Sequence, residues 1–386
     1  MLEVLTKPIS EPFGITDECR RYSAEEAATL LTLDPSLSVG QFQSIVGKAK
    51  LLKASLFSNA IFAVVPLYVT SICTEQCLYC NYRLGNHIQV DRHRLSDEEL
   101  LKETLFLMEE KGFRTIELVY SADHSFGIDT ICRHIELVRK TLETSGGGLI
   151  GLNAEPFTVD EYRLLKSAGI DFIVLWQETY DVDTYRQMHP GTSKKSNFEF
   201  RIDAYERMLT AGVEHIGLGV LSGLADWRKD WAMLLFHQEY LRNHYDMKSP
   251  IIGIPRLKAS EGAVIRETCH IPTDDEFLFC TAIQCLFDPL SLPFVNTRES
   301  WDLCVRLSAG GGALFTFNCS TIPGGYSLGR KGYQFPTFDF DIGLHRERAE
   351  KTGLHTRMKW AFGDIDAKKA DALRLCRDNH LAIGKR

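Results

Sequence analysis

The stretch "VPLYVTSICTEQCLYC", residues 65–80, joins an apolar, β-branched run directly to three closely spaced cysteines. The apolar part belongs to "AVVPLYVTSI" (63–72), a composition typical of a strand buried on both faces of a parallel sheet. Cys73, Cys77 and Cys80 then fall within eight positions. The stretch therefore predicts a buried strand whose carboxyl end opens into a loop rich in thiols.

Seven further apolar runs of the same kind recur along the chain, and segments with helical periodicity separate them. They read "TIELVY" (115–120), "LIGLNA" (149–154), "FIVLWQ" (172–177), "HIGLGV" (215–220), "IIGIPR" (251–256), "PFVNTR" (293–298) and "ALFTFN" (313–318). Eight strands alternating with helices predict an α/β fold, a (β/α)8 TIM-type barrel over residues 61–320. The link 299–312 is short, and we expect only a brief helix there.

The segments on either side of the barrel have a different pattern. Residues 1–60 contain two amphipathic helical stretches and predict a helical N-terminal extension. Residues 321–386 predict a polar C-terminal extension that packs on the barrel and contains one clear helix. Within the barrel, Ser96 with Glu99 and Thr158 with Glu161 form capping boxes that mark helix starts.

Composition and local pattern argue against a nucleic-acid-binding, secreted or membrane-spanning protein. The net charge is −7, with 44 % hydrophobic and 25 % charged residues, which fits a globular protein with a sizeable core. Nucleic acid is not expected as a partner, because phosphate binding needs clustered Lys and Arg. The N-terminus lacks the pattern of a signal peptide, and "AIFAVVPLYV" is too short to span a bilayer. We expect a cytoplasmic protein without a membrane partner.

Polar residues stand where most of the predicted strands end. Barrel enzymes place their chemistry at these carboxyl ends, so the pattern predicts an active site there. Beyond the cysteine loop, the residues at these positions are Asp123, His124, Asn153, Glu155, Gln177, Glu178, Arg256, Arg298, Glu299, Asn318 and Cys319.

The three cysteines have several possible roles. The chain has eleven cysteines, an odd number with irregular spacing, which does not fit the disulfide framework of a small secreted domain. Structural zinc wants four ligands, and the nearest candidates for a fourth are His87 and His93. A [4Fe-4S] cluster is normally held by cysteine thiolates, and three of them would leave one iron open. Zinc and plain structural thiols remain alternatives on spacing alone.

The C-x3-C-x2-C spacing after a first barrel strand resembles that of radical S-adenosylmethionine (SAM) enzymes. The resemblance implies a [4Fe-4S] cluster on Cys73, Cys77 and Cys80, with SAM on the open iron and Tyr79 beside its adenine. A set of ordered motifs resembles the aromatic amino-acid lyase branch of that superfamily. These motifs are "VPLYVTSICTEQCLYC", "WQETYDVDTYRQM", "AGVEHIGLGVLSGL", "IPRL", "NTRES" and "STIPGGYS".

The same resemblance assigns contacts with SAM to three more residues. Asp123, in "SAD", takes the place of a glutamate near the SAM amino group, with a shorter reach. Glu178 matches a position near the ribose, and Arg201 matches an arginine that pairs with the SAM carboxylate. The alternatives are a solvated loop acid for Asp123 and an exposed helix arginine for Arg201.

For the substrate, the resemblance implies an aromatic amino acid. Arg298 corresponds to the arginine that binds its carboxylate, and a guanidinium suits that role because it can form a bidentate pair. Tyr68 corresponds to the residue at the amine from which hydrogen is abstracted, unless it is simply barrel core. Thr316 is the nearest hydroxyl on the last strand, and Arg256 is expected at the rim without an assigned role.

The implied reaction begins with a 5′-deoxyadenosyl radical that removes a hydrogen from the amino group and leads to cleavage of the carbon skeleton. A tyrosine lyase would give dehydroglycine (2-iminoacetate) and p-cresol. The alternatives are a tryptophan lyase giving 3-methyl-2-indolic acid, which "NYRLGN" (81–86) favours, and a divergent lyase of another amino acid. A non-enzymatic iron–sulfur scaffold is the remaining alternative. An enzyme would need an electron donor such as flavodoxin or ferredoxin.

A further branch, the tyrosine lyase of [FeFe]-hydrogenase maturation, carries a second cluster on C-terminal cysteines. In residues 321–386 the only cysteine is Cys376. We therefore expect the tyrosine lyase of thiamine thiazole synthesis rather than the maturation enzyme. The motif "PGGYS" and the following "QF" favour this choice.

Overall fold

The computed structural model describes residues 22–34, 39–86, 91–266, 268, 270–316, 319–338 and 342–382. Nine parallel strands form one sheet. Their bounds are β1 Ala60–Thr70, β2 Thr115–Tyr120, β3 Leu149–Asn153, β4 Phe172–Val174, β5 Ile216–Gly219, β6 Ile251–Gly253, β7 Leu292–Val295, β8 Leu314–Thr316 and β9 His355–Arg357.

Helices connect and flank the strands. Their bounds are α1 Ala24–Leu30, α2 Val39–Phe57, α3 Asp97–Leu105, η2 Phe106–Glu110 (one π-helical turn), α4 Ile128–Glu143, α5 Val159–Ser167, α6 Val182–Met188, α7 Phe198–Ile202, α8 Ala204–Thr210, α9 Trp227–Tyr245, α10 Asp274–Phe287, α11 Trp301–Ala309, α12 Ile342–Lys351, α13 Phe362–Asp366 and α14 Lys369–Ala382. Among the described helices, none combines the length and apolar character needed to cross a lipid bilayer.

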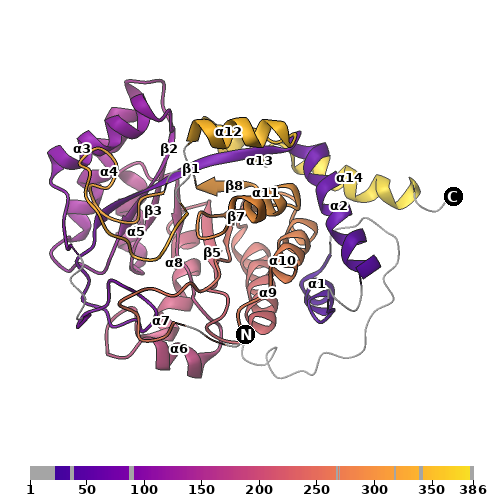
Figure 1. Ribbon diagram of the computed structural model, residues 1–386, viewed down its shortest axis with the longest axis horizontal. Coiled ribbons are helices and arrows are strands. Elements are labelled where there is room, and N and C mark those ends of the chain that lie inside the picture. Colours follow the sequence, from indigo (N-terminus) through magenta and orange to yellow (C-terminus); the bar gives the residue numbers. More distant parts are fainter. Residues whose placement is uncertain are drawn as a thin grey trace.

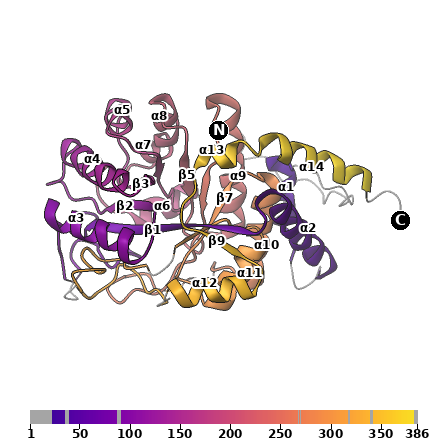
Figure 2. The ribbon, with the colours of Figure 1, turned by 90° about the horizontal axis from the view of Figure 1, so that it is seen from above.

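The sheet closes into a barrel because β1 pairs with β2 along one edge and with β8 along the other. Helices lie around the outside of the strands (Figures 1 and 2). The prediction of a (β/α)8 barrel is confirmed, and each of the eight expected runs contains a strand. The short link between β7 and β8 holds α11, a helix of nine residues.

The ladder differs from the expected strands in two respects. β4, β6 and β8 are only three residues long. β9 was not predicted, because "HTR" has no apolar pattern and two of its three residues are exposed. It pairs with Ala60–Phe62 on the edge of β1 opposite β8, before the ladder with β2 begins at Val65.

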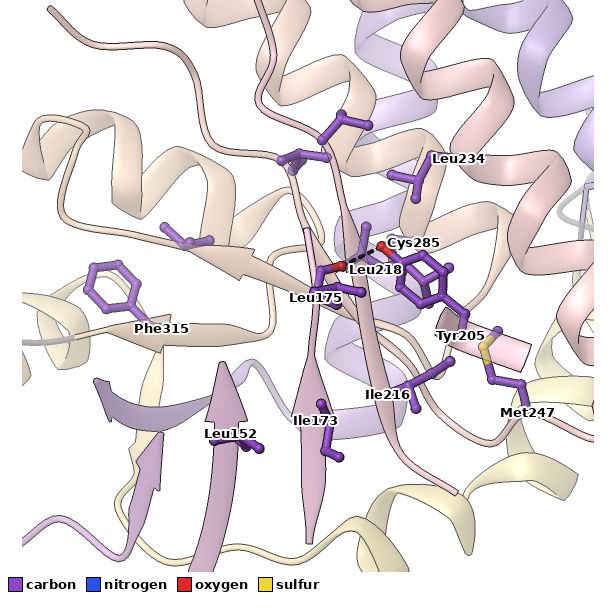
Figure 3. Packing of buried hydrophobic residues seen from close by; sticks show 14 of the residues in the cluster. Leu152, Ile173, Leu175, Tyr205, Ile216, Leu218, Leu234, Met247, Cys285 and Phe315 are labelled. Carbon is purple, nitrogen blue, oxygen red and sulfur yellow. Dashed lines mark hydrogen bonds between the residues drawn. The ribbon is translucent and has the colours of Figure 1, made fainter. Parts of the chain in front are cut away.

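Two apolar layers hold the barrel together. Leu175 and Leu218 from the sheet and Leu234 from α9 belong to the apolar layer between the strands and the helices (Figure 3). Inside, Phe62 and Phe172 belong to a second apolar cluster that Trp360 and Phe362 complete from the C-terminal segment. This cluster fills the amino-terminal end of the barrel, so that only the carboxyl ends of the strands can form an open site.

The flanking helices pack against the later half of the barrel. α1 contacts α9 and α10, and α2 contacts α10 and α14, which lies beside it in both views (Figures 1 and 2). The ammonium of Lys53 in α2 is buried and donates to the Ser308 carbonyl oxygen at 2.5 Å and to the Gly312 carbonyl oxygen. It therefore satisfies carbonyls at the end of α11, and burial lowers its pKa to about 7.

Residues 319–338 lie against the carboxyl end of β1 and are held there by Glu103 of α3. This fully buried carboxylate accepts from the backbone N–H groups of Tyr326 (3.0 Å), Ser327 (2.5 Å) and Leu328 (3.0 Å), and from the Ser327 hydroxyl (2.6 Å). The Tyr326 hydroxyl donates to the Pro66 carbonyl at 2.7 Å. The "PGGYS" motif is thus a loop tied to the barrel by one acid.

Replacing Glu103 by Gln should destabilise the fold by about 1–3 kcal/mol, because the amide turns a donor toward backbone N–H groups that then lack an acceptor. Glu98→Gln, an exposed site on the same helix, is the matched control with the same loss of charge. The free energy of unfolding of both variants would be measured by chemical denaturation. Equal stabilities would contradict this role of Glu103.

Candidate active site

The carboxyl ends of the strands surround a cavity of about 230 Å³. Every barrel strand or the loop after it supplies lining residues, so the site exists only once the barrel has closed. The polar and aromatic lining residues are Tyr68, Cys73, Glu75, Cys77, Tyr79, Cys80, Tyr82, Glu117, Tyr120, Ser121, Asn153, Glu155, Trp176, Glu178, Lys195, Arg201, Lys258, Phe294, Asn296, Thr297, Arg298, Thr316, Cys319, Gln334 and Phe335.

The thiols of Cys73, Cys77 and Cys80 all border this cavity and are free of disulfides. A tight turn, in which the Cys80 N–H donates to the Cys77 carbonyl at 3.1 Å, places the last two on one side. Burial raises the pKa of Cys73 to about 11 and also raises the pKa values of Cys77 and Cys80. A bound cation is therefore needed to hold them as thiolates.

The three thiols border one shared space. The ligands of a multi-iron cluster surround a common volume in this way, because each thiolate binds a different iron. Of the two histidines considered for zinc, His93 bonds Glu99 at 3.1 Å, and His87 lies outside the described residues.

Tyr79 is held in the cavity wall by His189, a residue that sequence reasoning missed. The two side chains are joined by a 2.8 Å hydrogen bond between the Tyr79 hydroxyl and the His189 Nε2. The His189 Nδ1 lies 2.8 Å from the Tyr185 carbonyl, which can only accept, so Nδ1 carries the proton and Nε2 accepts from Tyr79. Burial lowers the pKa of His189 to about 3 and keeps the ring neutral.

Glu178, which follows β4, and Arg201 of α7 lie beside each other in the cavity lining. Arg201 is buried and donates from Nε to the Trp176 carbonyl at 2.9 Å, while its guanidinium lies 3.7 Å from Glu178 Oε1. Lys195 adds a 2.5 Å ion pair to Glu178. Burial alone would raise the pKa of Glu178, but Lys195 and then Arg201 lower it to about 2.

The backbone of Glu178 is in the left-handed region, with φ of 73°. A non-glycine residue there costs about 1–3 kcal/mol and persists only where its surroundings require it. The Leu221 N–H donates to the Glu178 carbonyl at 2.8 Å and holds this turn. The turn keeps the carboxylate at the cavity beside two cations.

Arg298 and Tyr68 face the cavity from β7 and β1. The Arg298 guanidinium stacks 3.5 Å from the centre of the Phe335 ring, and in the described part of the chain no carboxylate pairs with it. The Tyr68 hydroxyl donates to Gln334 Oε1 at 2.8 Å, and Gln334 Nε2 lies 3.5 Å from the Cys80 sulfur. Gln334 therefore bridges the tyrosine and a cluster cysteine, a role the sequence did not reveal.

Thr316 lies at the carboxyl end of β8 and borders the same cavity. Its side chain is 2 % exposed, and its hydroxyl has no hydrogen-bond partner among the described residues. A buried hydroxyl without a partner is unfavourable, so this oxygen is available to a bound molecule.

The structure does not bring two of the predicted residues, Asp123 and Arg256, into the cavity. The Asp123 carboxylate accepts from the Thr70 and Ser125 hydroxyls at 2.8 Å and forms a bidentate pair with Arg94, while Ser121 of the same loop lines the cavity. The acid side chain turns back onto the end of β1 because its partners lie there.

The Arg256 guanidinium is likewise engaged away from the cavity, at the rim where the sequence expected it. It pairs with both carboxylate oxygens of Glu299 and lies 2.9 Å from Asp274. Its role is to join the end of β6 to α10 and to the loop after β7.

Four residues of the site belong to no motif from which the sequence could have predicted them. They are Glu117, Lys195 and Gln334 in the cavity lining and His189 behind Tyr79. Glu117 lies inside a run that reads as an ordinary buried strand, and a charge in such a run was the one clue to it. The other three come from loops whose position depends on the assembled barrel.

A closed barrel with three free thiols after its first strand and charged groups around one cavity defines the site of a cluster-dependent enzyme. The radical SAM superfamily model matches residues 67–235. 2-Iminoacetate synthase of Escherichia coli (strain K12) is 30 % identical over 301 residues, covering 76 % of each chain. 3-Methylornithine synthase of Methanosarcina barkeri (strain Fusaro) is 31 % identical over 320 residues, covering 78 % of this chain and 79 % of that protein.

Among solved structures, HydG, a maturase of the [FeFe]-hydrogenase, superposes with a TM-score of 0.83 at 26 % identity. The match covers 93 % of this chain and 78 % of that one. The chain therefore belongs to the radical SAM superfamily, in the branch related to 2-iminoacetate synthase and HydG. It is a radical SAM enzyme that uses a [4Fe-4S] cluster and SAM, and the prediction of both cofactors is confirmed.

The residues present fit these two groups. Cys73, Cys77 and Cys80 supply three thiol donors to a single cavity, leaving one position of a cubane without a protein thiol. The buried, partly paired charges of Glu178 and Arg201 border the same cavity and suit the hydroxyls and carboxylate of SAM.

Gln334→Met should lower the midpoint reduction potential of the cluster. The amide N–H near the Cys80 sulfur stabilises the more negative reduced state, and the methionine keeps the length of the side chain without the donor. An anaerobic redox titration followed by electron paramagnetic resonance measures the potential, with Tyr333→Phe as the neighbouring control. An unchanged potential would exclude an effect of this contact on the cluster.

Glu117→Gln should stabilise the fold above neutral pH. Burial raises the pKa of Glu117 to about 7, so between its unfolded value of 4.5 and about 7 the folded state keeps a proton that the unfolded chain has lost. Stability therefore falls as pH rises through this window, and the amide removes that loss. We expect the variant to gain on the order of 2–3 kcal/mol over the wild type at pH 8 and much less at pH 5.

The measurement is denaturant unfolding of wild type, Glu117→Gln and the exposed control Glu136→Gln at pH 5, 6.5 and 8. A difference between wild type and Glu117→Gln that is independent of pH would show that Glu117 does not titrate in this range.

Proposed function

We propose that this radical SAM enzyme cleaves the Cα–Cβ bond of tyrosine and gives 2-iminoacetate and p-cresol. The observation that carries the proposal is the position of Arg298. Its guanidinium faces the cavity of the three thiols, and it has no carboxylate partner among the described residues. A buried cation in this state suits the carboxylate of an amino acid.

The contacts of Tyr68 support a role at the amine of that amino acid. Its hydroxyl donates a hydrogen bond to Gln334 Oε1, so the lone pairs of the phenolic oxygen remain available to a hydrogen-bond donor on the substrate. Burial raises the pKa of Tyr68 and keeps the phenol protonated at neutral pH. Tyr68 and Arg298 together would orient the two ends of an α-amino acid head group.

Other residues of the cavity lining would hold SAM. We propose that Glu178 accepts from the ribose hydroxyls, that Arg201 donates to the SAM carboxylate and that Tyr79 lies beside the adenine. When bound, the cluster and SAM supply a 5′-deoxyadenosyl radical that removes a hydrogen atom from the substrate. This chain contributes the alignment of the two molecules and a site from which water is largely excluded.

The relatives favour tyrosine as the substrate. Two 2-iminoacetate synthases, from Escherichia coli and Salmonella typhimurium, are 30 % and 28 % identical to this chain over about three-quarters of its length. 3-Methylornithine synthase is 31 % identical to this chain, and its name favours an aliphatic amino acid with a terminal amine as the second candidate; lysine represents this class in the test. We further propose that a small redox protein such as flavodoxin or ferredoxin supplies the electron.

The test is anaerobic reconstitution of the cluster followed by incubation with SAM, a chemical reductant and one of tyrosine, tryptophan or lysine. We expect tyrosine to stimulate 5′-deoxyadenosine formation and to yield p-cresol, both measured by mass spectrometry. 3-Methyl-2-indolic acid from tryptophan, or turnover with lysine alone, would reassign the substrate. SAM binding without cleavage by any of them would point to a non-enzymatic scaffold.

Two sets of variants sharpen this test. Cys77→Ala should lose the visible absorbance of the cluster. Arg298→Met should raise the KM for the amino acid by roughly 10- to 100-fold, since a charge-assisted bond is lost. Arg298→Lys, which keeps the charge without the bidentate geometry, should lie between this variant and the wild type.

A further inference from the structure

Glu117 is a carboxyl group inside the barrel whose bonding is incomplete. It lies on β2, is 4 % exposed and lines the cavity. Asn153 Nδ2 donates to its Oε1 at 2.9 Å. Among the described residues, no donor is found for Oε2. Its ladder neighbours are Pro66 and Gly151, and neither has a side chain that can donate a second hydrogen bond.

The position of Glu117 is deeper than the groups proposed for the amino-acid head. Its partner Pro66 precedes Tyr68 by two residues, which places Glu117 about 7 Å further toward the apolar end of the barrel. Arg298 stands three residues beyond the last residue of β7, at the rim. A head group bound by Tyr68 and Arg298 would therefore direct its side chain down the barrel, toward Glu117.

The walls between rim and floor are apolar and partly aromatic. Trp176 and Phe294 line the cavity, with ring centres 6.2 Å apart. The Trp176 ring lies over Gly219 and Gly253, where an added Cβ would come within 2.6 Å and 2.4 Å of it. The two glycines thus make room for a flat apolar wall, which suits the body of a hydrophobic side chain but offers nothing to a polar tip.

Glu117 is the acceptor that a polar group at the end of a bound side chain could reach. An unpaired buried carboxyl is costly when ionised, and burial raises the pKa of Glu117 to about 7 for this reason. A donor from the ligand would complete its bonding and remove that cost. An apolar ligand would leave the cost in place and exclude the water that could otherwise reduce it.

We propose that Glu117 accepts a hydrogen bond from the far end of the substrate side chain and so selects amino acids that carry an N–H or O–H donor there. Phenol, indole N–H and ammonium groups share this chemistry. The inference rests on the proposed function, because it takes the head group to be bound at Arg298 and Tyr68.

The test compares amino acids in matched pairs that differ only in the donor: tyrosine with phenylalanine, and lysine with norleucine. SAM-cleavage rates with the reconstituted protein give kcat/KM for each, and calorimetric titration gives its binding. In the wild type, the donor-bearing member of the active pair should be favoured by at least about tenfold, since its absence leaves a buried polar group unpaired.

Glu117→Leu should abolish this preference, by weakening the donor-bearing member and leaving the other unchanged or improved. Val119→Ala, which faces the same cavity from the same strand, should weaken both members alike and keep the preference. If Glu117→Leu does not take up the cluster, Glu117→Met repeats the test with a side chain closer in length.

Equal use of both members by the wild type, or a preference that survives in the Glu117 variants, would overturn the inference and leave the proposed function intact. The proposed function fails separately, if no amino acid stimulates SAM cleavage by the wild type.

Discussion

The pairing of β1 with both β2 and β8 is the constraint on which the rest of this structure depends. This strand closes the barrel, and its carboxyl end leads directly into the loop of Cys73, Cys77 and Cys80. Its interior face also supplies Tyr68 to the cavity. Closure is therefore what brings the thiols to the same space as residues of the other seven strands.

The direction of the strands explains why all the chemistry lies at one end. In a parallel barrel, every carboxyl end opens on the same side, and the loops there are free to vary. Here the opposite end is filled by Phe62, Phe172 and the two aromatic residues Trp360 and Phe362. A cavity with a closed floor would give the proposed amino-acid substrate a defined depth, and the proposed role of Glu117 depends on that depth.

The C-terminal segment belongs to the site as much as the strands do. Glu103 fixes the backbone of "PGGYS", and from that anchor Gln334 reaches both Tyr68 and Cys80. Phe335 stacks on Arg298 from the same stretch. A segment that reads as a polar tail therefore links the proposed substrate-binding residues to the thiols.

The local sequence pattern was enough to predict the barrel strands and the cofactors. The apolar runs gave the eight barrel strands, since a strand buried on both faces has to be apolar along its length, and thiol spacing with ordered motifs identified the cofactors. Tyr79, Glu178, Arg201, Arg298 and Thr316 line one cavity, as expected from their places beside strands and loops. The places of these residues could be predicted because each depended on neighbours in the chain, whereas their contacts with SAM and the substrate stay predictions.

Only the tertiary structure decided which side chains turn inward and which are occupied elsewhere. Asp123 and Arg256 lie at strand ends, but their side chains pair with Arg94 and Glu299 outside the cavity. Glu117, Lys195 and Gln334 gain their positions from partners outside their own elements, and β9 forms only because the start of β1 has an unpaired edge before its ladder with β2. The closed barrel determines which partners a side chain has, and these partners cannot be inferred from the local sequence pattern.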